Sequence, residues 1–368
     1  MRTKRYWLVL AVTFVLVAAL LLPACAEEAP APTPAPAPAP APTPAPEPVK
    51  PVTLKFSYTM PSRASSAEAW EEYGEEVEEQ TGGKVKFDFY PGSTLFTIHE
   101  TPDSLLNRVA DIANLSCSVS RKLFPLFEIV QYPGLAFPAD IDGFTAAAAG
   151  QYKMIEKFPE LKAEFKDFKV LFFSVVGNYI PISTVPIRVP DDFSGLRIGG
   201  TGMKGDLVEA LGGAPVAFAP PETYMNVKTG VVDACYLCWF QVDDYKMWEV
   251  AEYFMDYGVG GASAMLIAMN LDSWNELPPD VQKVMTDLAP KGEREGHMCL
   301  VKTAEAGMGK TKEAGRTIIT PTKEEIALWE KACEPLWYAW VDRMEAEGYT
   351  SAEEMLNYWR ELKAAYEK

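Results

Sequence analysis

The alternation of short apolar segments with helical segments constrains the fold of this chain more than any other feature of its sequence. Strands are expected at residues 52–57, 85–90, 112–115, 169–176, 196–198 and 215–218, and helices at residues 67–80, 203–211, 245–254 and 279–288. Strands that are separated by helices favour parallel sheets in an α/β architecture. Residues 280–312 are mostly helix-compatible and unusually long for one domain, so we expect a helix that crosses between two lobes.

The N-terminus has the pattern of a secretory signal. Three basic residues precede an apolar run at residues 7–22, and small residues then lead to Cys25. This order predicts a signal peptide at residues 1–24, and its end resembles a bacterial lipobox, in which the cysteine is lipidated. An uncleaved membrane anchor is the alternative, although the run is short for a spanning helix, which needs about 20 residues. Either interpretation places the remaining chain outside the cytoplasm, in the periplasm or at the cell surface.

A proline-rich tether follows the lipidation site, over residues 25–50. Every second residue from Pro30 to Pro48 is proline. Such a composition cannot bury a core, and it favours an extended spacer of roughly 60 Å at about 3.1 Å per residue. A ligand for an SH3-type domain is the alternative, but a stalk that lifts a globular body off a membrane suits a secreted chain better. The globular body then begins near Pro51.

The charge balance excludes two classes of partner. The chain has 51 acidic and 34 basic residues, which gives a formal net charge of −17. Nucleic-acid binding needs a basic face, and so does electrostatic docking on anionic lipid. With 12% aromatic and only 23% charged residues, disorder over the whole chain is excluded too.

Signals for enzymatic chemistry are weak. His99 and His297 lie far apart and belong to no nucleophile elbow or zinc motif, so we expect no metal site. The segment from Gly200 to Gly205 spells Gly-x-Gly-x-x-Gly between a strand and a helix, and Glu222 is spaced like the ribose acid of a dinucleotide fold. The simpler interpretation is a turn whose backbone amides face a ligand at a helix N-terminus. We therefore expect no cofactor.

The cysteines do not form a complete disulfide framework. Apart from Cys25 there are five, which is an odd number. Cys235 and Cys238 make a single C-x-x-C pair, which is too little for a structural zinc site. A redox pair and two buried thiols are the alternatives, of which buried thiols are favoured.

Five segments together resemble one protein family. Residues 191–198, DDFSGLRI, resemble the D-x-x-G-L-K-I-R stretch of the solute-binding subunits of TRAP transporters, the DctP-like family 7 extracytoplasmic solute receptors. The other four are similar to family segments in the same order: QTGGKV at 80–85, LGGAPV at 211–216, ETY and TGVVD within 222–233, and N-x-x-x-W-x-x-L-P at 270–278. The resemblance covers residues 52 to about 289.

The resemblance implies a two-lobed, periplasmic-binding-protein-like α/β fold with a ligand cleft, crossing strands and a long interlobe helix. It implies a binding protein that closes about a hinge on a small organic acid-like solute, delivers it to a membrane permease and is not an enzyme. The expected parts are lobe I at 51–175 plus 264–308, lobe II at 176–263 plus 309–345, and a C-terminal helix at 346–368. A binding lipoprotein of another transporter or a ligand sensor is the alternative, followed by a secreted dinucleotide-dependent enzyme.

Departures from the family pattern bear on the solute. The family arginine that salt-bridges a carboxylate aligns with Gly199, and Arg197 points to the opposite face of the strand. The polar family segment after V-V-D is apolar and aromatic here, at residues 234–238. The family's simple C4-dicarboxylate specificity is therefore not expected, and a larger or less acidic solute, such as an aromatic or branched acid, fits better. If another arginine replaces the missing one, the candidates are Arg63, Arg121 and Arg188.

The resemblance and the pattern together predict a set of ligand-binding residues. Tyr224 and Asn270 match family positions near the binding region, and Tyr236, Trp239 and Phe240 bring aromatic surface, although core packing explains these three equally well. The expected ligand-binding residues are Gly199, Thr201, Tyr224, Tyr236, Trp239, Asn270, Asn178 and Tyr58.

Overall fold

The computed structural model describes residues 51–63, 66–218 and 222–366. The predicted signal peptide, the lipidation site Cys25 and the proline-rich tether lie outside the described residues. The described body begins at residue 51.

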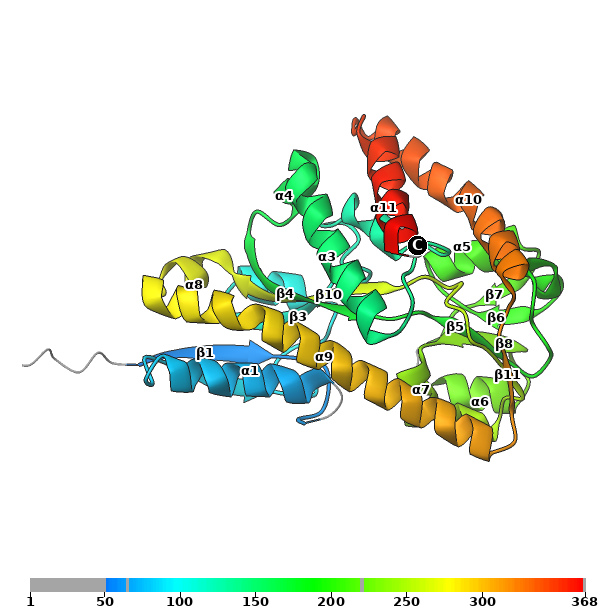
Figure 1. Ribbon diagram of the computed structural model, residues 1–368, viewed down its shortest axis with the longest axis horizontal. Helices are drawn as coiled ribbons and strands as arrows, with labels where there is room; N and C mark the ends of the chain where they lie inside the picture. Colours follow the sequence, from blue (N-terminus) through cyan, green and yellow to red (C-terminus); the bar gives the residue numbers. More distant parts are fainter. Residues whose placement is uncertain (1–50, 64–65, 219–221, 367–368) are drawn as a thin grey trace, which may run out of the picture. The chain divides into compact units, whose positions relative to one another are not determined.

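Two β-sheets organise this body, each with helices packed on it (Figure 1). The first sheet has the strand order β2-β1-β3-β10-β4, with bounds Val52–Ser57 (β1), Val85–Tyr90 (β2), Ile112–Ser116 (β3), Phe168–Val176 (β4) and Ser263–Asn270 (β10). The second has the order β11-β9-β5-β8-β6-β7, with bounds Ile180–Ser183 (β5), Arg197–Gly199 (β6), Ala214–Val216 (β7), Ala234–Leu237 (β8), Tyr253–Met255 (β9) and Thr317–Ile319 (β11). We call the part built on the first sheet lobe I and the part built on the second lobe II. The two-lobed α/β fold is as predicted.

The sheets are parallel as expected except for one strand in each, which runs the other way. β10 is antiparallel to β3 and β4, and β5 is antiparallel to β8 and β9. Both strands enter from the other lobe after a short connection, at residues 177–179 before β5 and residues 256–262 before β10. Each of the two strands therefore begins at the edge where its parallel neighbours end, as Ile180 pairs with Leu237 and Met265 pairs with Ser116, and it runs opposite to them.

The same topology makes the carboxyl ends of the parallel strands face each other across the two lobes. β4 runs parallel to β3, since both are antiparallel to β10, and it leaves its sheet towards β5. Ile180 at the start of β5 pairs with Leu237 at the end of β8. The ends of β3, β6 and β8 therefore lie at the edges where the chain passes between the lobes, and ligands of open α/β sheets bind at such carboxyl ends.

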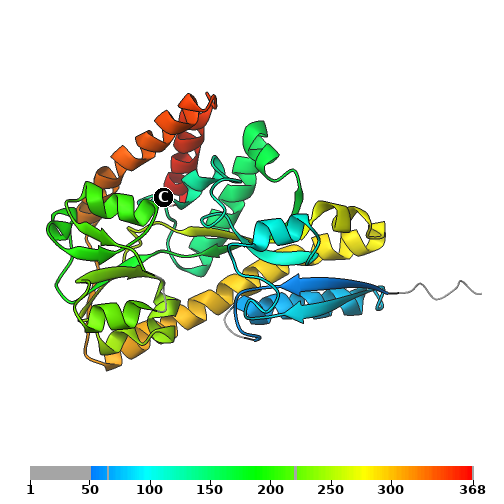
Figure 2. The same cartoon turned by 180° about the vertical axis from the view of Figure 1, so that it is seen from behind.

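The predicted long interlobe helix is present as α9, Pro279–Glu313. Its first half packs on α1, Ser66–Gln80, of lobe I, and its second half packs on α7, Trp239–Asp244, of lobe II. Figure 2 shows it passing from one sheet to the other from behind. The remaining helices are Thr101–Leu106 (α2), Ile141–Lys157 (α3), Pro159–Glu164 (α4), Met203–Ala210 (α5), Thr223–Lys228 (α6), Leu271–Asn275 (α8), Lys323–Ala346 (α10) and Ala352–Tyr366 (α11).

The helix predicted at residues 245–254 is wrong. The non-glycine residue Lys246 has a φ of 50°, a left-handed conformation that interrupts a helix after α7. A single 3₁₀ turn follows at Met247–Glu249, and the chain then becomes β9, which pairs with β5 and β11. Pairing in the sheet therefore overrides the local helical pattern.

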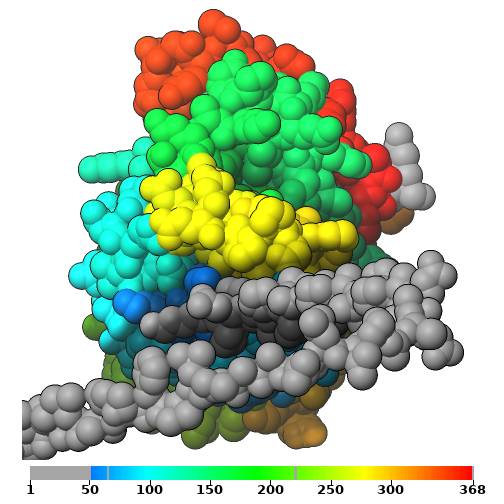
Figure 3. All heavy atoms as spheres, turned by 90° about the vertical axis from the view of Figure 1, so that its left-hand side faces the viewer, coloured from blue at the N-terminus to red at the C-terminus, as the bar shows by residue number. Residues whose placement is uncertain are grey.

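The C-terminal helices bind both lobes. Trp329 of α10 contacts Phe193 of lobe II, whereas the indoles of Trp337 and Trp340 donate hydrogen bonds to the carbonyls of Pro133 and Pro125 in lobe I. α11 packs against α3, and Figure 3 shows the end of the chain (red) beside the α3–α4 segment (green). No helix in the described ranges combines the length and the apolar character needed to cross a membrane.

Candidate functional site

The turn between β6 and α5 lies at the facing edge of lobe II. β6 ends at Gly199, and Gly202 at the helix start has a φ of 55°, which glycine adopts without strain. A Cβ atom on Gly200 would lie 3.3 Å from the backbone nitrogen of Gly205, so two glycines of the Gly-x-Gly-x-x-Gly motif allow the strand and helix to pack closely. The motif thus builds a compact strand–turn–helix.

A cavity of ≈ 140 Å³ opens at this turn. We call it the β6–α5 pocket. It contains three of the residues that the sequence predicts for the site, Gly199, Thr201 and Tyr236. The full lining is Tyr179, Gly199, Gly200, Thr201, Lys204, Phe218, Thr223, Cys235, Tyr236, Leu237 and Gln241. Strands, turns and helices of lobe II contribute most of it, and Tyr179 comes from the connection between the lobes.

Lys204 is the cation of this pocket. It is half-buried, and no carboxylate of the described residues acts on its charge. Its Nζ atom lies 3.5 Å from the ring centroid of Tyr179, a cation–π contact. Burial lowers the pKa of Lys204 from 10.5 to about 8, because a desolvated ammonium lacks a compensating anion. The pocket therefore contains a positive charge that a bound anion would compensate.

Arg121 reaches the same turn from lobe I. A side chain on Gly202 would meet its Nη1 atom at 3.3 Å. Arg121 forms an ion pair with the buried Glu128, which is also bound by Arg343 at 2.6 Å. Among the three arginines that the sequence offered as replacements, Arg63 pairs with acids of α1 and Arg188 pairs with Glu325. Arg121 is the one of the three that contacts the turn.

Asn178 and Trp239 line a second cavity, of ≈ 440 Å³, together with Ala304 and Met308 of α9. The Trp239 indole donates to Asp256 at 2.8 Å, and its ring stacks on Phe254. The structure does not bring these two predicted residues into the β6–α5 pocket.

The other three predicted residues have partners elsewhere. The Tyr58 hydroxyl donates to Glu71 in the core of lobe I. The buried Asn270 caps α8 by accepting from the Ser273 amide at 2.9 Å, and its side-chain nitrogen donates to the carbonyl of Leu105 at 2.9 Å. The Tyr224 hydroxyl donates to Glu249 at 2.8 Å. None of the three lines the pocket.

The space above Gly199 is filled by an aromatic ring. A Cβ atom at Gly199 would lie 2.3 Å from Cζ of Phe218, so Phe218 occupies the volume that a longer side chain would need. The backbone itself is not an obstacle, because Gly199 is absent from the positions with positive φ.

Gly199→Arg should therefore destabilise the protein unless Phe218 is removed as well. We expect the single variant to lose about 1–3 kcal/mol of unfolding free energy through overpacking. Gly199→Arg with Phe218→Ala should regain much of that loss and gain affinity for small carboxylates such as succinate. Chemical denaturation and calorimetry measure the two effects, and equal stability of the single and double variants would contradict the steric argument.

Several residues of the pocket escaped sequence reasoning, above all Lys204, Phe218 and Tyr179. Lys204 stands inside the glycine motif, in the first turn of a helix that follows a strand. A lysine at that place is a signal for an anion site. The glycine spacing directs attention to a dinucleotide motif instead, so the lysine is easily overlooked.

The described cysteines are all free thiols, and Cys117, Cys235, Cys238 and Cys333 are buried. Burial raises the pKa of the Cys235 thiol to about 12, which disfavours the reactive thiolate. Buried His297 accepts a hydrogen bond from the Val175 amide, and burial lowers its pKa to about 4. Within the described ranges no three histidine, cysteine or acidic residues gather as metal ligands.

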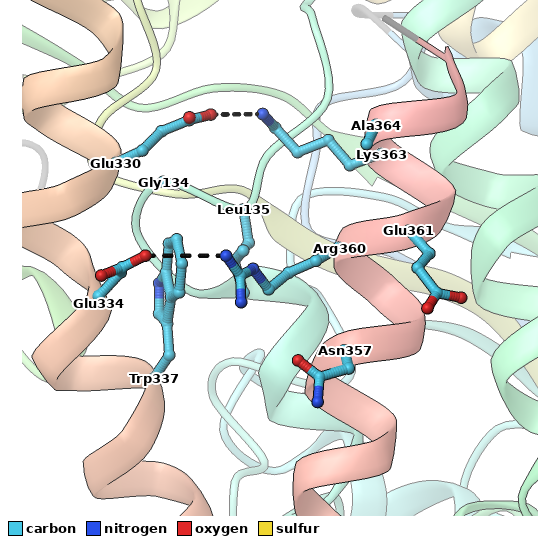
Figure 4. Close-up of a pocket in the computed structure, with 10 residues that line it drawn as sticks. All are labelled: Gly134, Leu135, Glu330, Glu334, Trp337, Asn357, Arg360, Glu361, Lys363 and Ala364. Carbon is cyan, nitrogen blue, oxygen red and sulfur yellow. Dashed lines mark hydrogen bonds and ion pairs between the residues drawn. The ribbon is translucent and has the colours of Figure 1, made fainter.

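A further cavity, of ≈ 500 Å³, lies between α10 and α11 (Figure 4). Lys363 pairs with Glu330 at 2.8 Å, and Arg360 lies 3.7 Å from Glu334 with its guanidinium over the Trp337 ring. These contacts join the two helices across the cavity, and none of the predicted site residues lines it.

Comparisons with known proteins agree with the two-lobed fold and show its family. Residues 56–343 match the family model DctP, described as bacterial extracellular solute-binding protein, family 7. The C4-dicarboxylate-binding periplasmic protein DctP of Rhodobacter capsulatus is 27% identical over 308 residues, which cover 81% of this chain and 89% of that protein.

Two solved structures have the same fold. A TRAP periplasmic solute-binding protein from Desulfovibrio salexigens has a TM-score of 0.76 and 26% identity, over 86% of this chain and 97% of that one. A TRAP solute-binding protein from Rhodoferax ferrireducens, in complex with copurified benzoate, has a TM-score of 0.73 and 22% identity, over 86% and 98%. The chain thus belongs to family 7 of the bacterial extracellular solute-binding proteins, as a TRAP-type member.

Proposed function

We propose that this protein captures a small organic acid in the β6–α5 pocket and delivers it to the membrane permease of a TRAP transporter. The observation that carries the proposal is Lys204, a half-buried ammonium whose charge no carboxylate of the described chain offsets. A carboxylate bound there would make a charge-assisted hydrogen bond, which is stronger than a neutral one.

The remaining pocket lining indicates the class of acid. Phe218, Tyr236 and Leu237 offer apolar and aromatic surface, and Lys204 is the one cation that lines the described pocket. A single carboxylate attached to an apolar body matches this arrangement better than a dicarboxylate does. The Rhodobacter relative is named for C4-dicarboxylates, whereas benzoate copurified with the Rhodoferax protein, so the fold encloses an aromatic acid in at least one case.

Mass spectrometry of the ligand released from purified protein tests the proposal. We expect a monocarboxylic acid with an aromatic or branched body. Calorimetry with benzoate, phenylacetate, succinate and malate should then rank the monoacids above the diacids. Tight succinate binding would overturn the solute class, and failure of every acid to bind would overturn the proposal itself.

Hinge closure is the expected mode of capture. The solute would be enclosed as the lobes close, with Lys204 on lobe II and Arg121, whose charge is already paired with Glu128, on lobe I. The predicted division into lobe I at 51–175 plus 264–308 and lobe II at 176–263 plus 309–345 is supported by the two sheets. We further propose that the protein has no catalytic activity, since its family and its structural neighbours are solute-binding proteins.

We also propose that the protein is a lipoprotein, held at the membrane through Cys25 and lifted off it by the tether at residues 25–50. The family is extracytoplasmic, and the apolar run that ends before Cys25 supports lipidation at that residue.

Cys25→Ser should leave precursor with its signal attached, because the modified residue is missing. Immunoblots of membrane and soluble fractions, with metabolic labelling by a fatty acid, measure the outcome. Mature protein of unchanged size and unchanged fatty-acid label would contradict the lipid anchor.

A further inference from the structure

Three serine hydroxyls meet at the facing edge of lobe I. Ser116 ends β3, Ser263 begins β10, and Ser118 lies between them, with its Oγ atom 2.9 Å from Oγ of Ser116 and 3.0 Å from Oγ of Ser263. Ser116 and Ser263 are buried, whereas Ser118 is partly exposed. Ser263 also lies close enough to the Tyr179 hydroxyl to lower its pKa. We call Ser116, Ser118, Ser263 and Tyr179 the hydroxyl cluster.

Tyr179 joins this cluster to the β6–α5 pocket. Its ring lines the pocket and carries the Lys204 ammonium 3.5 Å from its centroid, while its hydroxyl belongs to the cluster. The backbone amide of Tyr179 donates to the carbonyl of Gly261 at 2.9 Å. This hydrogen bond joins the two interlobe connections, to which these two residues belong. One tyrosine side chain therefore separates the cation of lobe II from the hydroxyl groups of lobe I.

The cluster is a neutral surface with spare hydrogen-bonding capacity. Each hydroxyl can donate one hydrogen bond and accept two, so the two contacts among the three serines leave one serine proton and several lone pairs unused. Burial raises the pKa of the Tyr179 hydroxyl, which keeps it protonated. Such a surface suits a group that both donates and accepts. A second carboxylate would need a cation or several donors, and the cluster contains no cation.

We propose that the hydroxyl cluster is the lobe I part of the solute site and selects an organic acid that carries a hydroxyl group, whose carboxylate binds Lys204. This inference rests on the proposed function and names its substrate class more narrowly. Ser118 makes the contact to the solute hydroxyl, and Tyr179 holds Ser263 in place while its ring supports Lys204.

Matched pairs of acids that differ by one hydroxyl group test the proposal. Calorimetry with lactate and propionate, 3-hydroxybutyrate and butyrate, and mandelate and phenylacetate should show a hydroxy acid binding about fivefold or more tighter than its partner, in at least one pair. Ser118→Ala and Tyr179→Phe should each abolish that preference, so that the two acids of the pair bind about equally. Ser351→Ala is the matched control. Ser351 lies in the C-terminal region, and its hydroxyl donates to Glu160 of α4.

The outcomes distinguish a failure of the hydroxyl-cluster proposal from a failure of the proposed function. Equal affinities within every pair, or a hydroxyl preference that survives in both variants, would overturn the hydroxyl cluster while the organic-acid function stands. If no acid of either kind binds, the proposed function fails and the inference fails with it. Ser118→Ala removes one atom from a partly exposed side chain, and thermal denaturation of all three variants verifies that they are folded.

Discussion

Lys204→Met should weaken solute binding by about 2–4 kcal/mol, or about thirtyfold to a thousandfold, because it removes the charge that the solute carboxylate would bind. The alkyl chain over Tyr179 is largely preserved by methionine, so the shape of the pocket changes little. Calorimetry with the solute identified from purified protein measures the loss.

In the absence of solute, Lys204→Met should have a higher free energy of unfolding than the native protein. Burial lowers the pKa of Lys204 from 10.5 to about 8, and one pKa unit corresponds to about 1.4 kcal/mol. The charged lysine thus costs at most about 3 kcal/mol of unfolding free energy below pH 8. Between pH 8 and pH 10.5 the unfolded chain binds the proton and the folded one releases it, so native stability should rise with pH across this window. The methionine variant should lack that rise.

Two controls separate the charge of Lys204 from a general effect. Lys204→Arg keeps the charge and should retain part of the affinity, whereas Lys228→Met removes a lysine that lies over Tyr224 outside the pocket and should change nothing. Solute affinity of the native protein should also fall above pH 8, as the ammonium deprotonates. Full affinity in Lys204→Met would move the solute out of the β6–α5 pocket.

Much of the fold could be predicted because strands such as β3 and β4 are largely buried and their apolar runs are easily recognised. The long helix α9 was predicted from its helix-compatible residues, its length and the family resemblance, and the structure confirms it. The strands β5 and β10 were not predicted. Their antiparallel direction depends on the lobe from which the chain arrives and not on their own residues. The wrong helix at residues 245–254 has the same origin, because β9 is selected by its neighbours in the sheet.

The site could be predicted only in part, for a related reason. Gly199 was predicted through the family pattern and Thr201 through the glycine-rich turn, both of which are local in sequence, and both residues line the β6–α5 pocket. Lys204 and Tyr179 are 25 positions apart, and their contact exists only because the edges of two sheets face each other. Asn270 shows the opposite case: its amide looks suited to a ligand in the sequence, but its hydrogen bonds go to the backbone at the start of α8 and to the carbonyl of Leu105.

Trp329→Ala should lower the free energy of unfolding by about 3–5 kcal/mol, the usual cost of removing a fully buried tryptophan. Trp329 is 0% exposed, and its indole donates to the carbonyl of Arg188 at 2.9 Å. Its ring contacts the ring of Phe193 edge-on, with 5.2 Å between the two ring centroids. These contacts attach the first half of α10 to lobe II. The second half is attached to lobe I through Trp337 and Trp340. The variant should therefore release one lobe from a helix that still holds the other.

Chemical denaturation and small-angle scattering together distinguish lost packing from a freed hinge. Leu328→Ala, at the neighbouring and half-exposed position, is the matched control and should stay within about 0.5 kcal/mol of the native protein. Trp340→Ala should cost a similar amount to Trp329→Ala but act on the attachment to lobe I. If α10 restrains the lobes, both tryptophan variants should show a larger change in radius of gyration on solute binding than the native protein shows. A large loss of stability with an unchanged solute response would mean that α10 supports the core and does not govern closure.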